Sequence, residues 1–183
     1  MTAKQQWLVV LGIVAVLGGG AFTATHFLKD ELTSVSVGAD APGFTVQTLD
    51  APSKPKTLTD YRGDVVVLNI WATWCIPCRT EMPSIQALYS ALGPKGLRVV
   101  AVSVDDAGSE QKIRDFVKEY GLTFEVLHDQ AGVIQGLYRT TGVPETFVID
   151  RQGVIRKKWI GEDDWASAGN RRLLEQLLAE PKA

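Results

Sequence analysis

Apolar and polar positions along this chain recur with spacings that predict a mixed α/β domain. The runs Val65–Trp71 (VVVLNIW) and Leu97–Val104 (LRVVAVSV) are almost continuously apolar, which is typical of strands that are covered on both faces. Apolar positions at helical spacing predict helices over Cys75–Leu92 and Ser109–Tyr120. A last helix carries Leu173, Leu174, Leu177 and Leu178 along one side, with Ser167 or Asn170 as the expected cap.

Shorter patterns complete the expected element order. Strands are predicted near residues 44–48, 56–58 and 124–127, and a short helix near residues 133–138. Two further strands, at residues 146–150 and 154–160, flank the turn Arg151–Gly153 and predict a hairpin. The order predicts an α/β fold: a mixed sheet with helices on both faces and an antiparallel hairpin at one edge. This layout by itself indicates no function.

The N-terminal segment differs from the rest of the chain. From Trp7 to Leu28 there is no Lys, Arg, Asp or Glu, and a helix of that length rises about 33 Å, enough to cross a hydrocarbon core of about 30 Å. We therefore expect an N-terminal transmembrane anchor over residues 1–28, a linker over residues 29–36, and one folded domain over residues 37–183. A cleaved secretory signal is the alternative, although the run is long and lacks a clean cleavage site near Ala21–Thr25.

The composition is that of an ordinary globular domain. Hydrophobic residues make up 45% and charged residues 22% of the chain, which argues against disorder. Beyond residue 28, 18 basic side chains face 21 acidic ones, a net charge of −3. Because that balance offers no electrostatic attraction to nucleic acid, the expected partners are proteins or small molecules.

Cys75 and Cys78 are the two cysteines of the chain. An exported domain with a single close pair has no disulfide framework to build, which points to a chemical role for the pair. The pair follows a buried strand and opens a helix, where unpaired amides and the helix dipole favour a thiolate at Cys75. Cys75 is thus the expected nucleophile that forms a mixed disulfide, and Cys78, one turn inward, is the expected resolving thiol.

A zinc site is the alternative use of two thiolates. The pair supplies half of a tetrahedral zinc shell, and the sequence holds no second Cys-x-x-Cys. His128 is a lone histidine at the end of a predicted strand, for which a structural role is expected. We therefore expect no metal and no cofactor beyond a redox-active Cys75–Cys78 disulfide.

The motif and its surroundings resemble a known family. The segment VLNIWATWCIPC, followed later by GVPETFVID, is similar to the thioredoxin superfamily, and the stretch GADAPGFTV…LTDYRGD resembles its membrane-anchored TlpA, ResA and CcmG group. The resemblance covers roughly residues 37–180. It implies a thioredoxin-like three-layer α/β/α fold with an N-terminal β extension and a central αβ insert at about residues 105–127. The segment GEDDW resembles TlpA-type members and VPETFVID resembles CcmG-type members, so the subgroup is left open.

The resemblance also implies roles for individual residues. Pro144 matches the cis-proline that packs beside the cysteines, and Val143 would pair with the backbone of the partner protein. Asn69 stands where thioredoxin has a buried aspartate, which leaves Glu81 as the expected acid–base helper for Cys78. A solvated helix glutamate is the alternative for Glu81.

Other side chains around the motif are expected to contact the substrate or to lie in the core. Trp74, Ile76 and Pro77, together with Val143, are expected to contact the substrate, and Trp71 to lie in the core. Pro77 suits the first helical turn, where its missing N–H costs little. Other polar residues receive ordinary surface or strand-end roles; these are Arg79, Asp105, Glu145, Lys157 and Lys158.

The resulting hypothesis is an exported, membrane-tethered thiol–disulfide oxidoreductase that reduces disulfides of partner proteins. The resemblance implies apocytochromes c or copper-delivery and oxidase-assembly proteins as partners, an electron-donor protein in the same membrane, and a domain on the periplasmic side of the inner membrane. A peroxiredoxin-like peroxidase is a second hypothesis, but its Pro-x-x-x-Thr-x-x-Cys pattern fails at Leu68 and Ala72. A copper chaperone of similar fold is a third, although the cysteine spacing is one residue short.

Overall fold

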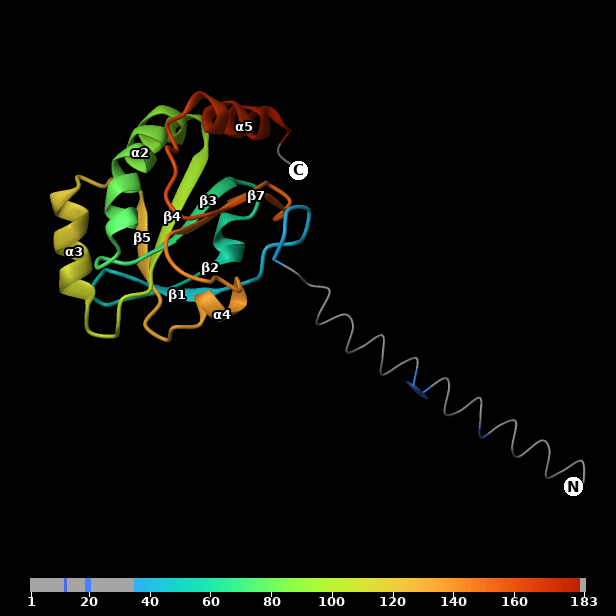
Figure 1. Cartoon of the computed structure of the whole chain (residues 1–183), viewed down its shortest axis with the longest axis horizontal. Helices are drawn as coiled ribbons and strands as arrows, with labels where there is room; N and C mark the ends of the chain where they lie inside the picture. The colour runs from blue at the N-terminus through green and yellow to red at the C-terminus, as the bar shows by residue number, and fades with distance from the viewer. Residues whose placement is uncertain (1–11, 13–18, 21–34, 182–183) are drawn as a thin grey trace, which may run out of the picture. The chain divides into compact units, whose positions relative to one another are not determined.

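The computed structural model describes residues 12, 19–20 and 35–181 (Figure 1). The folded unit begins at Val35. Its elements are β1 (Thr45–Thr48), β2 (Pro55–Thr57), η1 (Leu58–Tyr61), β3 (Val65–Trp71), α2 (Ile76–Leu92), η2 (Gly93–Lys95), β4 (Leu97–Ser103), α3 (Glu110–Glu119), β5 (Glu125–His128), α4 (Ile134–Leu137), β6 (Glu145–Ile149), β7 (Ile155–Ile160) and α5 (Ala168–Ala179).

Within this unit the strands form one seven-stranded mixed sheet in the order β2-β1-β5-β4-β3-β6-β7. Strand β3 pairs in parallel with β4, which in turn pairs in parallel with β5. Strand β6 runs antiparallel to β3 on its other side, and β7 completes the hairpin at the sheet edge. The expected mixed α/β sheet with an antiparallel hairpin edge is confirmed.

Alternation along β3 divides the interior into two cores. Val65, Val67 and Trp71 face the core that α2, α3 and α5 cover, whereas even-numbered residues of β3 face the core that α4 and η1 cover. Figure 1 shows the three longer helices on one side of the sheet and α4 on the other. Because side chains alternate along a strand, Asn69 lies on the α2 side. This placement decides the chemistry of the site.

The element boundaries lie within one or two residues of those predicted for the main strands and helices. Helix α2 begins at Ile76, with Cys75 as its N-cap, and it contains Pro83. Ser167 is the cap of α5, where its Oγ accepts the N–H of Asn170. Helix α3 and β5 form the expected insert, and β5 lies between β4 and β1 in the sheet.

The expected anchor over residues 1–28 falls, apart from Gly12, Gly19 and Gly20, outside the described residues. Among the residues that are described, no helix has the length and apolar character needed to cross a membrane.

Candidate active site

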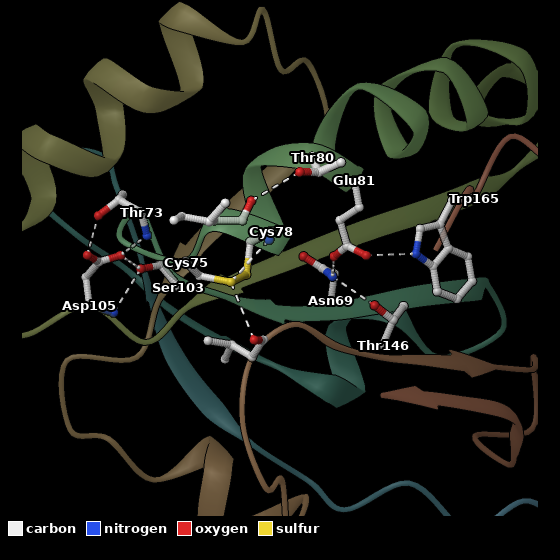
Figure 2. The surroundings of a disulfide bond; sticks show 12 residues. Asn69, Thr73, Cys75, Cys78, Thr80, Glu81, Ser103, Asp105, Thr146 and Trp165 are labelled. Atoms are coloured by element: carbon white, nitrogen blue, oxygen red, sulfur yellow. Dashed lines mark hydrogen bonds between the residues drawn. A yellow bond between two sulfur atoms is a disulfide. The ribbon is translucent and has the colours of Figure 1, made fainter. Parts of the chain in front are cut away.

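The site lies where β3 ends and α2 begins. Cys75 and Cys78 form a disulfide there, with their Cα atoms 5.3 Å apart. Cys75 Sγ accepts the backbone N–H of Cys78 at 3.1 Å, so the first turn of the helix points a donor at this sulfur (Figure 2). A donor of this kind stabilises a thiolate at Cys75 once the disulfide is reduced.

The two sulfurs differ in their access to a partner. Cys75 is 4% exposed and Cys78 is fully buried. Cys75 is therefore less exposed than a nucleophile at a helix tip was expected to be, but it remains the outer member of the pair. This order supports attack by Cys75 and resolution by Cys78.

The bond between Val143 and Pro144 is cis, as the resemblance implied. Pro144 is buried, and the carbonyl oxygen of Val143 lies 3.4 Å from Cys75 Sγ. The segment that leads into β6 thus runs directly beside the reactive sulfur. Its place fits the predicted role of Val143 in holding an extended partner segment by backbone pairing.

The residues that flank Cys75 in the chain have exposed apolar side chains. Trp74 is 61% exposed and Ile76 is 76% exposed, while Pro77 is also exposed on the first turn of α2. Trp71 is fully buried in the core, as expected. Large apolar side chains that remain in water are characteristic of a surface that another molecule covers. The rim around Cys75 therefore suits a protein substrate.

Glu81 is buried on α2, one turn beyond Cys78, and not solvated as in the alternative interpretation. Asn69 Nδ2 donates to Glu81 Oε1 at 2.8 Å, and the indole N–H of Trp165 donates to Oε2 at 3.3 Å (Figure 2). Burial raises the pKa of Glu81 from 4.5 to about 7, although both donors and the backbone N–H of Asp163 oppose that rise. A carboxyl with this pKa is suited to exchange a proton with Cys78 near neutral pH.

Asn69 orients Glu81 and has no proton of its own to exchange. Its amide also donates to Thr146 Oγ1 on β6 at 2.8 Å, which fixes the direction of the Nδ2 group. Asn69, at the position where thioredoxin has an aspartate, therefore holds Glu81 of the neighbouring helix in place.

Asp105 was expected only to end a strand, but it also holds the loop that precedes Cys75 in place. Its buried carboxylate accepts the backbone N–H and the hydroxyl of Thr73 and the hydroxyl of Ser103. Burial alone would raise the pKa of Asp105, but these hydrogen bonds and the nearby Lys112 ammonium lower it below its ordinary value. The end of β4 thus holds the residues just before the cysteines.

We predict that Asp105→Ala lowers the free energy of unfolding by about 3 kcal/mol, because buried donors on Thr73 and Ser103 lose their acceptor. Urea unfolding of the oxidised protein measures this change. The exposed neighbour Asp106 provides the matched control, and Asp106→Ala should change the value by less than about 0.5 kcal/mol. Equal effects of the two substitutions would contradict the role of Asp105.

The sequence suggested a surface carboxylate at Glu145, but this side chain, directly after Pro144, is fully buried. It forms an ion pair with Lys158 at 2.9 Å and accepts the N–H of Thr141 at 3.3 Å. Lys157 is also in contact with other groups, since its Nζ lies 3.2 Å from Asp163. The two lysines of β7 therefore serve packing and ion pairing and are not simply solvated.

Arg79 and His128 have partners other than a metal ion or the cysteine sulfurs. Arg79 donates to the Tyr120 hydroxyl and pairs with Glu119 on the neighbouring helix region. His128 is fully buried, with Nε2 2.8 Å from the carbonyl oxygen of Asp105 and Nδ1 3.4 Å from Glu110. Within residues 35–181 no three His, Cys, Asp or Glu side chains gather as metal ligands.

Sequence reasoning missed Trp165 as a member of the site. The tryptophan belongs to the GEDDW segment, whose resemblance to TlpA-type members assigns it no role. Its contact with Glu81 joins residues that are 84 positions apart, and no local spacing reports such a contact.

Comparisons with known proteins agree with this geometry. The model of the AhpC/TSA family matches residues 37–158. The thiol-disulfide oxidoreductase ResA of Oceanobacillus iheyensis is 38% identical over 151 residues, which cover 81% of this chain and 76% of that protein. The ResA protein of Geobacillus thermodenitrificans is 35% identical over 156 residues, which cover 84% of this chain and 87% of that protein.

Solved structures of other proteins share this fold. A crystal structure from Chlorobium tepidum, described as a thiol:disulfide interchange protein DsbE, has a TM-score of 0.65 and 30% identity. The match covers 78% of this chain and 95% of that one. The sheet, the Cys-x-x-Cys pair at the start of α2 and these relatives agree with one another: the chain belongs to the AhpC/TSA family of thioredoxin-like proteins and is a thiol–disulfide oxidoreductase that works through Cys75 and Cys78.

Proposed function

We propose that this oxidoreductase is tethered to the inner membrane with its domain on the periplasmic side, and that it reduces disulfides of exported proteins during cytochrome c maturation or the assembly of copper sites in cytochrome oxidase. The observation that carries the proposal is the apolar rim of Trp74 and Ile76 around Cys75. A rim of this kind favours a protein substrate over a small oxidant. The relatives named ResA and DsbE support the same class of reaction.

The membrane part of the proposal rests on the sequence from Trp7 to Leu28, which has no Lys, Arg, Asp or Glu. An exported compartment is oxidising, so a dithiol that works there needs a supply of electrons. A tether keeps the domain beside an electron-donor protein in the same membrane. Fractionation and protease accessibility of the full chain in spheroplasts test the tether and the orientation.

Trapping identifies the partner. In the full chain expressed in its own host, Cys78→Ala should leave Cys75 joined to the partner as a mixed disulfide, which mass spectrometry identifies after acid quenching. We expect exported proteins that carry a pair of cysteines, and the purified partner should then be reduced by the wild-type domain. Adducts made only with cytoplasmic proteins would contradict the proposal.

The two alternative functions find less support at the site. The positions of the peroxidase proline and threonine are Leu68 and Ala72, both fully buried apolar residues, so we expect hydrogen peroxide to be consumed no faster than by a simple thiol. A copper carrier would need a histidine near the cysteines, but both nitrogens of His128 face Asp105 and Glu110.

A further inference from the structure

Trp165 places an indole N–H on the carboxyl group that serves the resolving cysteine. Its Nε1 donates to Glu81 Oε2 at 3.3 Å, while Asn69 donates to Oε1 at 2.8 Å (Figure 2). Asn69 and Trp165 thus supply side-chain donors to different oxygens of Glu81. The backbone N–H of Asp163 adds to the stabilisation of the carboxylate, whereas the charge of the Asp163 side chain opposes it. Trp165 is itself fully buried, so water does not compete for its N–H.

The indole is held from two sides. The backbone N–H of Trp165 donates to Ser84 Oγ at 3.0 Å, and that hydroxyl donates to the carbonyl oxygen of Glu81 at 2.8 Å. The ammonium of Lys157 on β7 lies 4.8 Å from the centroid of the Trp165 ring. The tryptophan is thus connected to α2 through its backbone and to β7 through its ring.

The turn that carries Trp165 is fixed by its own contacts. Gly161 begins the turn with a φ of 88°, a backbone conformation that favours glycine, and its N–H donates to Pro144 O at 2.9 Å. Asp163 then accepts from Lys157 at 3.2 Å and from Asn170 at 3.0 Å. The position of the indole is therefore set by the sheet edge and by the last helix.

Glu81 is buried, but it borders a cleft on this side of the molecule. This cleft between α2 and the turn is lined by Thr80, Glu81, Pro83, Ser84 and residues 162–164. The cleft therefore brings solvent close to the buried glutamate.

We propose that Trp165 is a positioning residue for the resolving step: its indole N–H orients Glu81 and stabilises the carboxylate that takes the proton of Cys78. In that step Glu81 accepts the thiol proton and the Cys78 thiolate attacks Cys75 Sγ. The bond between Cys75 and the partner sulfur breaks, the Cys75–Cys78 disulfide forms, and the partner leaves as a thiolate that is protonated by solvent. The inference depends on the disulfide chemistry of Cys75 and Cys78, whatever the partner protein is.

A single-turnover reaction of the reduced protein with 5,5′-dithiobis(2-nitrobenzoate) separates the two steps. The first release of thionitrobenzoate reports attack by Cys75, and the second reports resolution by Cys78. Trp165→Phe keeps an aromatic ring but removes the N–H, so the carboxylate loses one of its donors. We expect the pH midpoint of the second phase to rise by about one unit, with a rate at pH 7 about fivefold lower and the first phase unchanged.

Trp159→Phe is the matched control. The ring of Trp159 also lies 4.8 Å from the Lys157 ammonium, but its N–H donates to the carbonyl oxygen of Glu162 and not to Glu81. This variant should leave both phases as in the wild type. Glu81→Gln should remove this pH midpoint from the second phase. The double variant, Glu81→Gln with Trp165→Phe, should then show the same pH dependence as Glu81→Gln alone.

A measurement on the unaltered tryptophan covers the case in which Trp165→Phe does not fold. In the oxidised protein the cysteines do not titrate, so the ¹⁵N-indole resonance of Trp165 should move with a midpoint at pH of about 7. The Trp159 resonance should show no such transition, and Glu81→Gln should abolish it for Trp165. The proposal would be overturned if the pH transition of the Trp165 resonance persisted in Glu81→Gln. It would also be overturned if the second phase of Trp165→Phe kept the wild-type rate and pH midpoint.

Discussion

Cys75→Ala is expected to lower the rate of protein-disulfide reduction by about a thousandfold or more, to the level of a simple thiol. Cys75 is the sulfur that accepts the Cys78 N–H and lies 3.4 Å from the Val143 carbonyl oxygen, beside the exposed Trp74 and Ile76. Cys78 is fully buried and has no route to the sulfur of a partner. Reduction of insulin with dithiothreitol as electron donor measures the loss.

Cys78→Ala is the matched variant because it removes the other half of the same disulfide. It should also stop turnover, but it should accumulate a mixed disulfide, which Cys75→Ala should not do. Alkylation followed by mass spectrometry distinguishes the two, and thermal unfolding of both reduced proteins shows that the fold is retained. A Cys75→Ala protein that forms adducts as readily as Cys78→Ala would reverse the assignment of roles.

The second large effect concerns stability and its dependence on pH. The pKa of Glu81 is raised from 4.5 to about 7 by burial, so the folded protein binds a proton more tightly than the unfolded chain does. The stabilisation from this proton is complete below pH 4.5 and is lost as the pH rises through 7. At about 1.36 kcal/mol per pKa unit, the loss amounts to about 3 kcal/mol.

Glu81→Gln should remove this dependence, since the amide occupies a similar volume without a charge. We expect the variant to be more stable than the wild type by about 2 to 3 kcal/mol at pH 8 and to differ little below pH 4.5. Urea unfolding of the oxidised proteins across this range measures the difference. Glu162→Gln, at an exposed glutamate of the same cleft, should keep the wild-type slope. Parallel slopes for Glu81→Gln and wild type would refute the role of burial.

These two predictions differ in how far the sequence alone supports them. The strand before the cysteines was recognisable because VVVLNIW is a run of residues that suit a strand covered on both faces, and all seven residues of β3 are buried. The location of Cys75 at the start of a helix followed from the apolar spacing after it. Both patterns are local, and hydrophobic spacing reports local structure well.

Local sequence patterns do not reveal the roles of residues that depend on distant contacts. Asp105 looked like the end of a strand because its partner Thr73 is 32 positions away. Glu145 looked like a surface residue because Lys158 meets it only across the β6–β7 pairing. A polar residue in a sequence carries no mark of its burial, since the cost of burying it is offset by partners that only the fold brings near.

The sequence by itself determined the α/β class, the position of the cysteine pair between strand and helix, and the division of the pair into an outer and an inner sulfur. The tertiary structure decided the ionisation of the site, because the packing of α2 against β3 and the turn before α5 removes Glu81 from water and supplies its side-chain donors, Asn69 and Trp165. The physical reason is that the free energy of a buried charge depends on every group around it, whereas strand and helix formation depend mainly on neighbours along the chain.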